Sequence, residues 1–493
     1  MPVDLTKMPI DHRAAQYQPL FQNLQGNILK GHGRNFSVHI FLQCTSDPRS
    51  LRDWVREFAT RYVTSMRQQL KEADEFRAYG VPGRLFGNVF LSAKGYEALG
   101  YTREAITRAF AEQPAVIAGR EVVNVTFVEG MAAAQHELND PHPETWEAAY
   151  QHQRIGAMLL LADDDEGFLL RQTRRVIDAA QTVASVLTVE RGRVMRNTQG
   201  ENIEHFGYVD GRSQPLFFAH DIEAEQRRGG VQKWDPSAPL SLALIADPYA
   251  APRQDCFGSY LVFRKLEQNV RGFREREEHL ARRLGLQGSA MERAGALIIG
   301  RFKDGTPVTS SAVDAMNPRV LNNFNYAEDA DGTRCPFSAH IRKMNPRGDG
   351  ARLRKENPAT YADASLQDHE QGRRIVRRGM PYGVRQIDPR DNPRTEQLPT
   401  GDVGLLFMCF QSSLANQFGF LQKLWANAPD FARENTGIDP LVGQHGDHLC
   451  PIPQRWPLKW GKAETTPFAF EGFVSLKGGE FLFAPSIPFL TNL

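Results

Sequence analysis

The sequence predicts an α+β fold made of two similar units packed side by side. Apolar runs typical of strands alternate with amphipathic helical stretches in the first half of the chain, and the same order of strand and helix returns in the second half. Hydrophobic residues make up 41% and charged residues 24% of the chain, which are globular proportions. The 493 residues are enough for one large two-part domain or for two to three domains.

In the first half, strands are predicted where β-branched and aromatic residues cluster, and helices where apolar residues recur every three or four positions. The acidic run at 163–166 suits the positive N-terminus of the helix that follows it. The predicted elements are a strand over 36–44, a helix over about 46–70, a strand over 87–92, helical segments through Tyr96 and Leu99 and over 104–110, a strand over 157–162 and a helix over 168–180.

In the second half, the predicted elements are a strand over 258–264, a charged helix over 267–284, a strand over 296–300, a strand over 404–410 and a helix over 414–425. Between the last two strands lies an interval, 301–402, that is rich in Arg, Asn, Pro, Gly and Asp. Ordinary connections are far shorter, and a long ordered insertion usually carries function. A flexible linker is the alternative for this interval.

Charge and composition exclude several classes of protein. Lys and Arg total 59 against 58 Asp and Glu, a net charge of +1, whereas proteins that bind nucleic acid need a basic surplus. No run of 18 apolar residues predicts a membrane helix, and the first residues do not resemble a signal peptide. The five cysteines form no Cys-x-x-Cys pair. These features predict a reduced cytoplasmic enzyme with no nucleic-acid or membrane partner, and they leave its oligomeric state open.

The first segment that suggests chemistry is 206–215, where Gly207 and Gly211 flank Asp210. Glycines permit backbone angles closed to other residues and let the chain approach a flat ligand closely. Such a loop could present a single, poorly solvated carboxylate to a reacting group. The alternative is an ordinary turn in which the aspartate bonds its own backbone.

Two further segments combine histidine or arginine with turn-forming residues. In 334–347, His340 could ligate a metal through one ring nitrogen while the other donates to a carboxylate, or it could be a structural histidine. The cations after it, Arg342, Lys343 and Arg347, could meet propionates or other acids. In 373–383, four arginines occur within six residues, and Arg377 or Arg378 could stabilise developing negative charge in a cleft. A solvated basic segment is the alternative there.

Other signals are weaker. If 404–410 is a strand, Leu405, Phe407 and Cys409 share one face, which is either core or the ceiling of an apolar cofactor pocket. His445 and His448 stand three positions apart, but without further ligands nearby a polar loop is favoured. The chain contains no phosphate-binding loop, zinc-protease motif or Gly-x-Ser-x-Gly motif.

Together, these segments resemble the dye-decolourising (DyP-type) peroxidase family of haem proteins, in its larger, elaborated branch. The resemblance covers essentially the whole chain, and its motifs occur in the family's order. They are LQGNILKGHGR at 24–34, GYVDGRSQP at 207–215, CPFSAHIRK at 335–343, NPR at 345–347, IVRRGMPYG at 375–383 and GGEFLFAPSIPFL at 478–490.

The resemblance implies two ferredoxin-like modules of the dimeric α+β barrel type, with one haem b per chain held mainly by the second. We expect an N-terminal module over 1–215 and a C-terminal module over 216–493 that contains the insertion. The resemblance implies that His340 is the proximal iron ligand, Asp210 the distal carboxylate and Arg377 the distal arginine. It also implies that Leu405 and Phe407 make apolar distal contacts and that Asp439 is the partner of the proximal histidine. Gly207, Gly211 and Arg342 are expected to make further haem contacts. Arg377 is preferred to Arg378 because the family's arginine stands four residues before the proline, here Pro381. Some members place the histidine's partner in the helix after the 404 strand, but 411–416 contains no acid.

The implied activity is reduction of hydrogen peroxide with oxidation of dyes and of phenolic or lignin-like compounds. Asp210 would move the peroxide proton and Arg377 would stabilise the departing oxygen. An acidic pH optimum is expected, because aspartates ionise at lower pH than histidines. A surface tyrosine or tryptophan could relay electrons from bulky reductants, but the sequence gives no way to choose one. Two alternatives are a haem-carrying protein for haem or iron handling with incidental peroxidase activity, and a haem-free hydrolase that uses Asp210.

Overall fold

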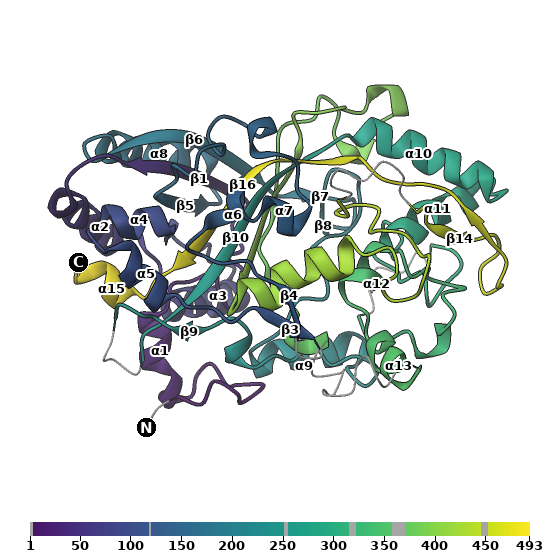
Figure 1. Cartoon of the computed structure of the whole chain (residues 1–493), viewed down its shortest axis with the longest axis horizontal. Coiled ribbons are helices and arrows are strands. Elements are labelled where there is room, and N and C mark those ends of the chain that lie inside the picture. The colour runs from purple at the N-terminus through teal and green to yellow at the C-terminus, as the bar shows by residue number, and fades with distance from the viewer. Residues whose placement is uncertain are drawn as a thin grey trace.

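The protein is described from a computed structural model. The described residues are 3–117, 120–250, 255–314, 322–356, 370–391, 393–444 and 452–493. His445, His448 and part of the 301–402 insertion lie outside these ranges. Figure 1 shows the N-terminal elements on the left, the helices α10–α13 on the right, and long strands crossing between them.

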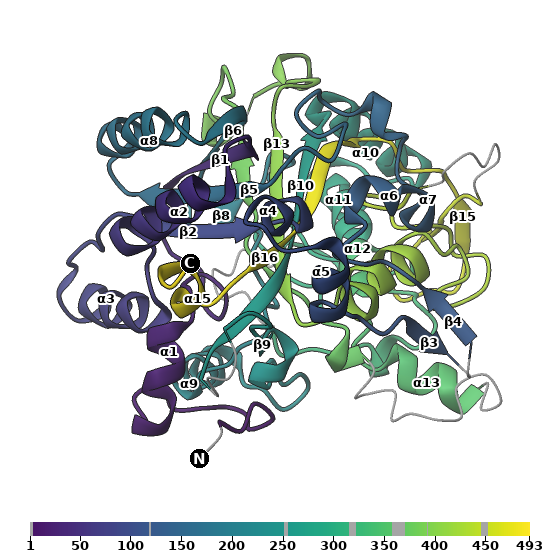
Figure 2. The same ribbon diagram turned by 60° about the vertical axis from the view of Figure 1, so that its left-hand side comes forward.

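The first module is a four-stranded antiparallel sheet covered by helices. Its chain order, strand–helix–strand–strand–helix–strand, and its sheet order, β6-β1-β5-β2, are those of a ferredoxin-like unit. Its elements are β1 (Phe36–Cys44), α2 (Pro48–Tyr62), α3 (Met66–Tyr79), β2 (Phe86–Leu91), α4 (Ala93–Ala98), α5 (Arg103–Ala109), β5 (Ala157–Asp163), α8 (Glu166–Ala180) and β6 (Ala184–Arg193). Figure 2 shows α2, α3 and α8 outside the strands.

The helix predicted over about 46–70 is two helices. The chain leaves the helical conformation at Val63, and the hydroxyl of Ser65 then caps α3 by accepting from the amide of Gln68. Asp165 caps α8 in the same way through the amide of Phe168, so the acidic run before this helix has the predicted role.

The second module repeats the pattern with strands in the order β12-β13-β10-β16. Its main elements are β10 (Phe257–Gln268), α10 (Val270–Arg283), α11 (Glu292–Ile299), β12 (Met380–Tyr382), β13 (Gly404–Gln411), the π-helical turns Leu414–Gly419 and Leu421–Ala426, and β16 (Val474–Ala484). Single residue pairs join the two sheets at both edges, Tyr382 with Gly192 and Phe483 with Leu91. The strands therefore form a closed ring, and the predicted fold class is confirmed. The division at 215/216 falls between the strands of the two modules and stays a prediction.

The prediction of a strand over 296–300 is wrong, because these residues end α11. Every residue of the helix from Ala294 to Ile299 is buried, so its apolar run shows no helical periodicity. Gly300 ends the helix with φ +99°, a left-handed conformation that favours glycine.

The 301–402 interval contains ordered structure that positions the site. It includes α12 (His340–Met344), α13 (Asp349–Glu356) and β11 (Val376–Arg377), and β11 pairs with β13. The described part of the interval is therefore not a simple linker. Smaller elements elsewhere are α1 (Gln18–Asn23), β3 (Ala115–Ile117), β4 (Arg120–Val123), α6 (Gly130–Ala133), α7 (Gln135–Leu138), β7 (Met195–Arg196), β8 (Asn202–Ile203), α9 (Ala219–Gly229), β9 (Ile245–Ala246), β14 (Arg455–Pro457), β15 (Thr465–Pro467) and α15 (Ile487–Thr491).

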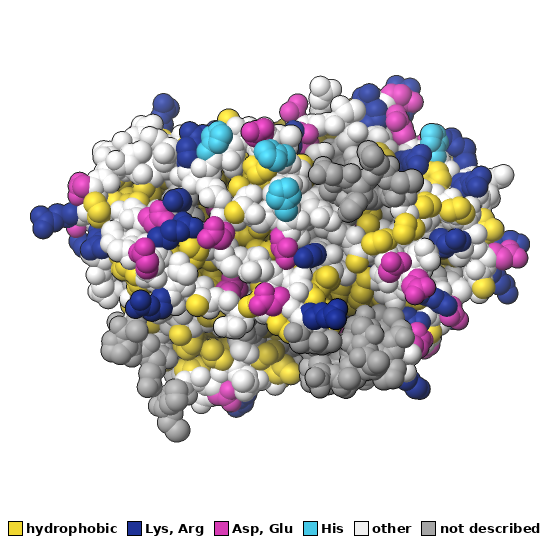
Figure 3. Space-filling view, viewed as in Figure 1, with side chains coloured by type: hydrophobic (Ala, Val, Ile, Leu, Met, Phe, Trp, Pro, Cys, Tyr) yellow, Lys and Arg dark blue, Asp and Glu magenta, His cyan; other side chains and the backbone are white. Residues whose placement is uncertain are grey.

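Two apolar clusters form the core. One includes the buried apolar residues of the ring of strands, and the other includes those of α10 and α11 together with Trp456. Among the described residues, no helix is long and apolar enough to cross a membrane. On the face shown in Figure 3, cationic and anionic side chains are intermixed, as expected from the near-zero net charge.

Candidate functional site

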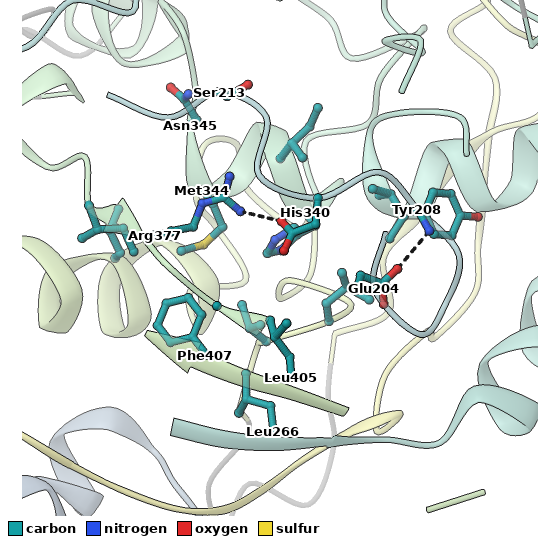
Figure 4. A pocket seen from close by; sticks show the side chains of 18 of the residues that line it. Glu204, Tyr208, Ser213, Leu266, His340, Met344, Asn345, Arg377, Leu405 and Phe407 are labelled. Atoms are coloured by element: carbon teal, nitrogen blue, oxygen red, sulfur yellow. Dashed lines mark hydrogen bonds and ion pairs between the residues drawn. The ribbon is translucent and has the colours of Figure 1, made fainter. Parts of the chain in front are cut away.

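A cavity lies against β10 and β13 of the second sheet. Residues between 204 and 215, which follow β6, and residues of α11, α12 and β11 also line it. Its lining includes Asp210, His340, Arg377, Leu405 and Phe407, which the sequence singled out. Figure 4 shows His340, Arg377, Leu405 and Phe407 around one space, carried by α12, β11 and β13. These residues come from distant parts of the chain, so the fold brings together what the motifs predicted separately.

His340 is the first residue of α12 and is held by a buried carboxylate. Its Nδ1 lies 2.8 Å from Oδ2 of Asp439, whose side chain is fully buried. The other oxygen of Asp439 accepts from the amides of Leu441 and Val442. Burial alone would raise the pKa of Asp439, but the imidazole and the amide donors outweigh it, so this pKa lies below its ordinary value. The contact leaves Nε2 of His340 as the nitrogen available to a ligand in the cavity.

Asp210 and Arg377 form a pair in the same cavity. Arg377 Nη1 lies 3.4 Å from Asp210 Oδ1, and Arg377 Nη2 donates to the carbonyl of Arg212. Pairing of β11 with β13 fixes Arg377 opposite Cys409. Arg378 instead donates to the carbonyls of residues 27 and 28 and does not line the cavity. Both members of the pair are about one-third exposed, which leaves them accessible to a small molecule.

Gly207 and Gly211 are not among the residues that line the cavity, so their predicted role as cofactor contacts stays a prediction. Both adopt positive φ angles, +95° and +79°, with no heavy atom near the position of a Cβ. They permit the turns on either side of Asp210. The carboxylate of Glu204 secures the same loop by accepting from the amides of Phe206 and Tyr208.

Arg342 has a different place from the one predicted. Its side chain is 1% exposed and does not line the cavity. Its five N–H donors are all used, by the carboxylates of Asp329 and Asp349 and by the carbonyls of Asp329 and Cys335. Arg342 therefore anchors α12 and has no donor left for a further acid.

Arg347, not Arg342, is the arginine of this segment that lines the cavity. Its described hydrogen-bond partners, Asn322, Phe324 and Ser213, supply carbonyl and hydroxyl oxygens. Arg301 lines the cavity beside it and also contacts Ser213 and Asn322. Burial, together with the charge of Arg301, lowers the pKa of Arg347 to about 9. Sequence reasoning grouped Arg347 with other cations and missed Arg301, which has no motif around it.

β13 supplies an apolar wall. Leu405 and Phe407 line the cavity, whereas Leu406 and Met408 are buried on the opposite face. Leu266, Ile299, Leu421 and Leu441 extend the apolar lining. A flat, largely apolar group with acidic side chains fits this cavity, because an imidazole nitrogen can bind its metal and buried arginines can meet its acids. The site therefore combines what a haem would need, an imidazole for its iron, an apolar wall and arginines for its acids.

The comparisons with known proteins agree with a haem site. A family model described as the DyP dimeric alpha+beta barrel domain matches residues 23–196, and one described as Dyp-type peroxidase, C-terminal, matches residues 297–436. The multifunctional dye peroxidase DyP2 of Amycolatopsis sp. is 40% identical over 100% of both chains. A dye-decolorizing peroxidase of Mycetinis scorodonius is 28% identical over 94% of this chain and 86% of its own. The crystal structure of an Anabaena sp. DyP-type peroxidase has a TM-score of 0.87 at 42% identity, covering 99% and 98% of the two chains.

The chain belongs to the DyP-type peroxidase family. It is a haem-dependent peroxidase that uses hydrogen peroxide to oxidise dyes. The alternatives of a haem-handling protein and a haem-free hydrolase are not favoured.

Proposed function

We propose that His340 binds the iron of one haem b per chain and that Asp210 and Arg377 act together on hydrogen peroxide. The observation that carries this proposal is the meeting of the three side chains in one cavity, although they come from separate segments of the chain. When bound, haem supplies the iron at which peroxide is reduced and the oxidising equivalents that reductants consume.

The carboxylate of Asp210 accepts a proton from one oxygen of hydrogen peroxide and returns it to the departing oxygen, directly or through one water. The guanidinium of Arg377 stabilises negative charge on that departing oxygen. Arg377 is suited to this role because its hydrogen bond to the carbonyl of Arg212 and the pairing of β11 fix its position.

Asp439 holds the ring of His340 in one orientation and makes its imidazole more electron-rich. Leu405 and Phe407, which line the cavity, would keep water away from the reacting peroxide. Arg347 and Arg301 are the groups that would receive the propionates, since charge-assisted pairing with carboxylates is favourable for arginines held away from water. Phenolic and lignin-like compounds are the further reductants that we propose beside dyes.

The test is spectroscopic. Protein produced with haem supplied should show an intense Soret band, and His340→Ala should lose most of it. His279→Ala, on the exposed face of α10, is the matched control and should retain the band. A His340→Ala protein with a full Soret band and wild-type peroxide turnover would rule out the proposed ligand.

A further inference from the structure

The cavity contains a tyrosine that the proposed mechanism does not use. Tyr208 lies two residues before Asp210, lines the cavity and is 3% exposed. Within the described part of the chain, it is the tyrosine that lines this cavity, and no described tryptophan does so. Figure 4 shows it beside Glu204 on the same loop, with its hydroxyl pointing away from His340.

The hydroxyl of Tyr208 is paired with a buried carboxylate. It donates to Oε1 of Glu277 at 2.9 Å, and Oε2 of Glu277 accepts from Arg274 at 2.6 Å. Glu277 is on α10 and is 3% exposed. The phenol therefore has a proton acceptor within hydrogen-bond distance, in a place that water does not reach.

This pairing has a redox consequence. Burial, together with the charge of Glu277, raises the pKa of Tyr208 well above its ordinary range, so the phenol does not ionise by itself. Removing one electron from a neutral phenol makes its proton strongly acidic. The proton can then cross the existing hydrogen bond to Glu277, which leaves a neutral tyrosyl radical and a neutral glutamic acid.

We propose that Tyr208 is a redox-active residue of this peroxidase, with Glu277 as its proton acceptor. In the haem-loaded protein, the Tyr208 ring would give one electron to the oxidant that the peroxide reaction supplies, while the phenolic proton would move to Glu277 Oε1. When a reductant later returns an electron to the ring, the proton moves back and the pair is restored. This inference rests on the proposed function, because the peroxide reaction must supply the oxidant.

Other buried tyrosines either do not line the cavity or have no hydrogen bond to a carboxylate. Tyr150 donates to Glu190 at 3.1 Å but does not line the cavity. The hydroxyls of Tyr326 and Tyr382 have no hydrogen-bond partner among the described residues. Tyr150 is therefore the matched control, since it is buried and bonded to a carboxylate but lies elsewhere.

The experiment mixes the haem-loaded protein with one equivalent of hydrogen peroxide, without reductant, and freezes it for electron paramagnetic resonance. We expect a tyrosyl signal, assigned by the narrowing that ring-deuterated tyrosine produces. Tyr208→Phe should abolish this signal and Glu277→Gln should greatly reduce it, whereas Tyr150→Phe should leave it unchanged. Each variant is first checked for a wild-type Soret band.

The outcomes separate this inference from the proposed function. A Soret band that does not respond to peroxide would contradict the proposed function. A normal response with no tyrosyl signal, or with a full signal in Tyr208→Phe, would overturn the role of Tyr208 alone. If Tyr208→Phe does not bind haem, a full signal in Glu277→Gln would overturn it instead.

Discussion

At the scale of single residues, the site depends on which side chains are already saturated by neighbours. Arg342 and Arg347 are five positions apart and chemically identical, yet the first is enclosed by Asp329 and Asp349 and the second faces the cavity. The motif around His340 predicted a cluster of cations, but it could not say which of them has acids nearby. Those acids come from outside the motif, so the choice is made by tertiary packing.

Asp439 shows the opposite case. The resemblance indicated it, and the structure places it 2.8 Å from His340 across 99 positions of the chain. Its amide also donates to the carbonyl of Ala426, which fixes the loop behind the π-helical turns. The absence of an acid at 411–416 is therefore compensated by a loop that no local pattern would have connected with His340.

The first prediction concerns Asp210. Asp210→Asn keeps the shape of the side chain but cannot accept the peroxide proton, so the rate of the reaction with hydrogen peroxide should fall by about 10²- to 10⁴-fold. The Soret band should stay unchanged, because Asp210 does not hold the haem. Stopped-flow absorbance measures this rate.

The matched control for Asp210→Asn is Glu201→Gln. Glu201 is a nearby carboxylate that pairs with Arg212 at 2.6 Å but does not line the cavity. Glu201→Gln should retain most of the wild-type rate of the reaction with hydrogen peroxide. A rate in Asp210→Asn equal to that of the control would remove Asp210 from the proton transfer.

At the scale of elements, periodicity predicted the strands and most helices but failed where burial is uniform. Strands β1, β5 and β13 lie within one residue of their predicted ends, since each is a short apolar run bounded by turn residues. Helix α11 was misassigned because its residues from Ala294 to Ile299 are all buried, so neither period is visible in the letters. The close approach of α11 to α12 is likewise a tertiary feature.

The second prediction tests the close approach of α11 to α12. A Cβ at Gly300, which ends α11, would collide with the side chain of Ile341 on α12. Gly300→Ala should therefore displace α12 and its His340, which weakens haem binding. Gly285→Ala is the control, because Gly285 also has a positive φ, +69°, but no neighbour within 4 Å. Haem titration should show weaker binding for Gly300→Ala only, and equal affinities would contradict this account.

The third prediction concerns the joint between α6 and β16. Oε1 of Glu480 on β16 accepts from the amide of Met131 on α6, and burial raises the pKa of Glu480 from 4.5 to about 7. The folded protein therefore holds this proton more tightly than the unfolded chain does. Below pH 4.5, the protonation of Glu480 contributes fully to the free energy of unfolding. This contribution of about 3 kcal/mol is lost as the pH rises through about 7.

Glu480→Gln removes this titration while keeping an acceptor for Met131. The midpoint of thermal unfolding of the haem-loaded protein should fall less between pH 5 and pH 8 in the variant than in the wild type. Glu57→Gln, at an exposed position on α2, should behave as wild type. An identical pH dependence in Glu480→Gln and wild type would show that Glu480 does not titrate in this range.

At the scale of the whole molecule, the cavity joins segments that lie far apart in the chain. Arg377 and Asp210 meet across 167 positions, and the ring of strands closes through the single pairs Tyr382 with Gly192 and Phe483 with Leu91. The sequence predicted two repeated units because each unit has its own strand and helix pattern. It could not show how their edges join, because one residue pair at each seam leaves no periodic signal.

The last prediction links haem binding to the stability of the whole fold. Without an anionic partner, the buried charge of Arg347 opposes folding, as its lowered pKa indicates. If a haem propionate supplies that partner, as proposed, haem should raise the unfolding temperature by mass action, and a charge-assisted hydrogen bond should account for about 1.5–3 kcal/mol of the gain. Arg347→Met should therefore show a smaller haem-induced rise. Arg334, an arginine outside the cavity, is about one-third exposed, and Arg334→Met should show the full rise. Thermal unfolding with and without haem measures both. A full rise in Arg347→Met would mean that the propionates are held by other residues of the cavity.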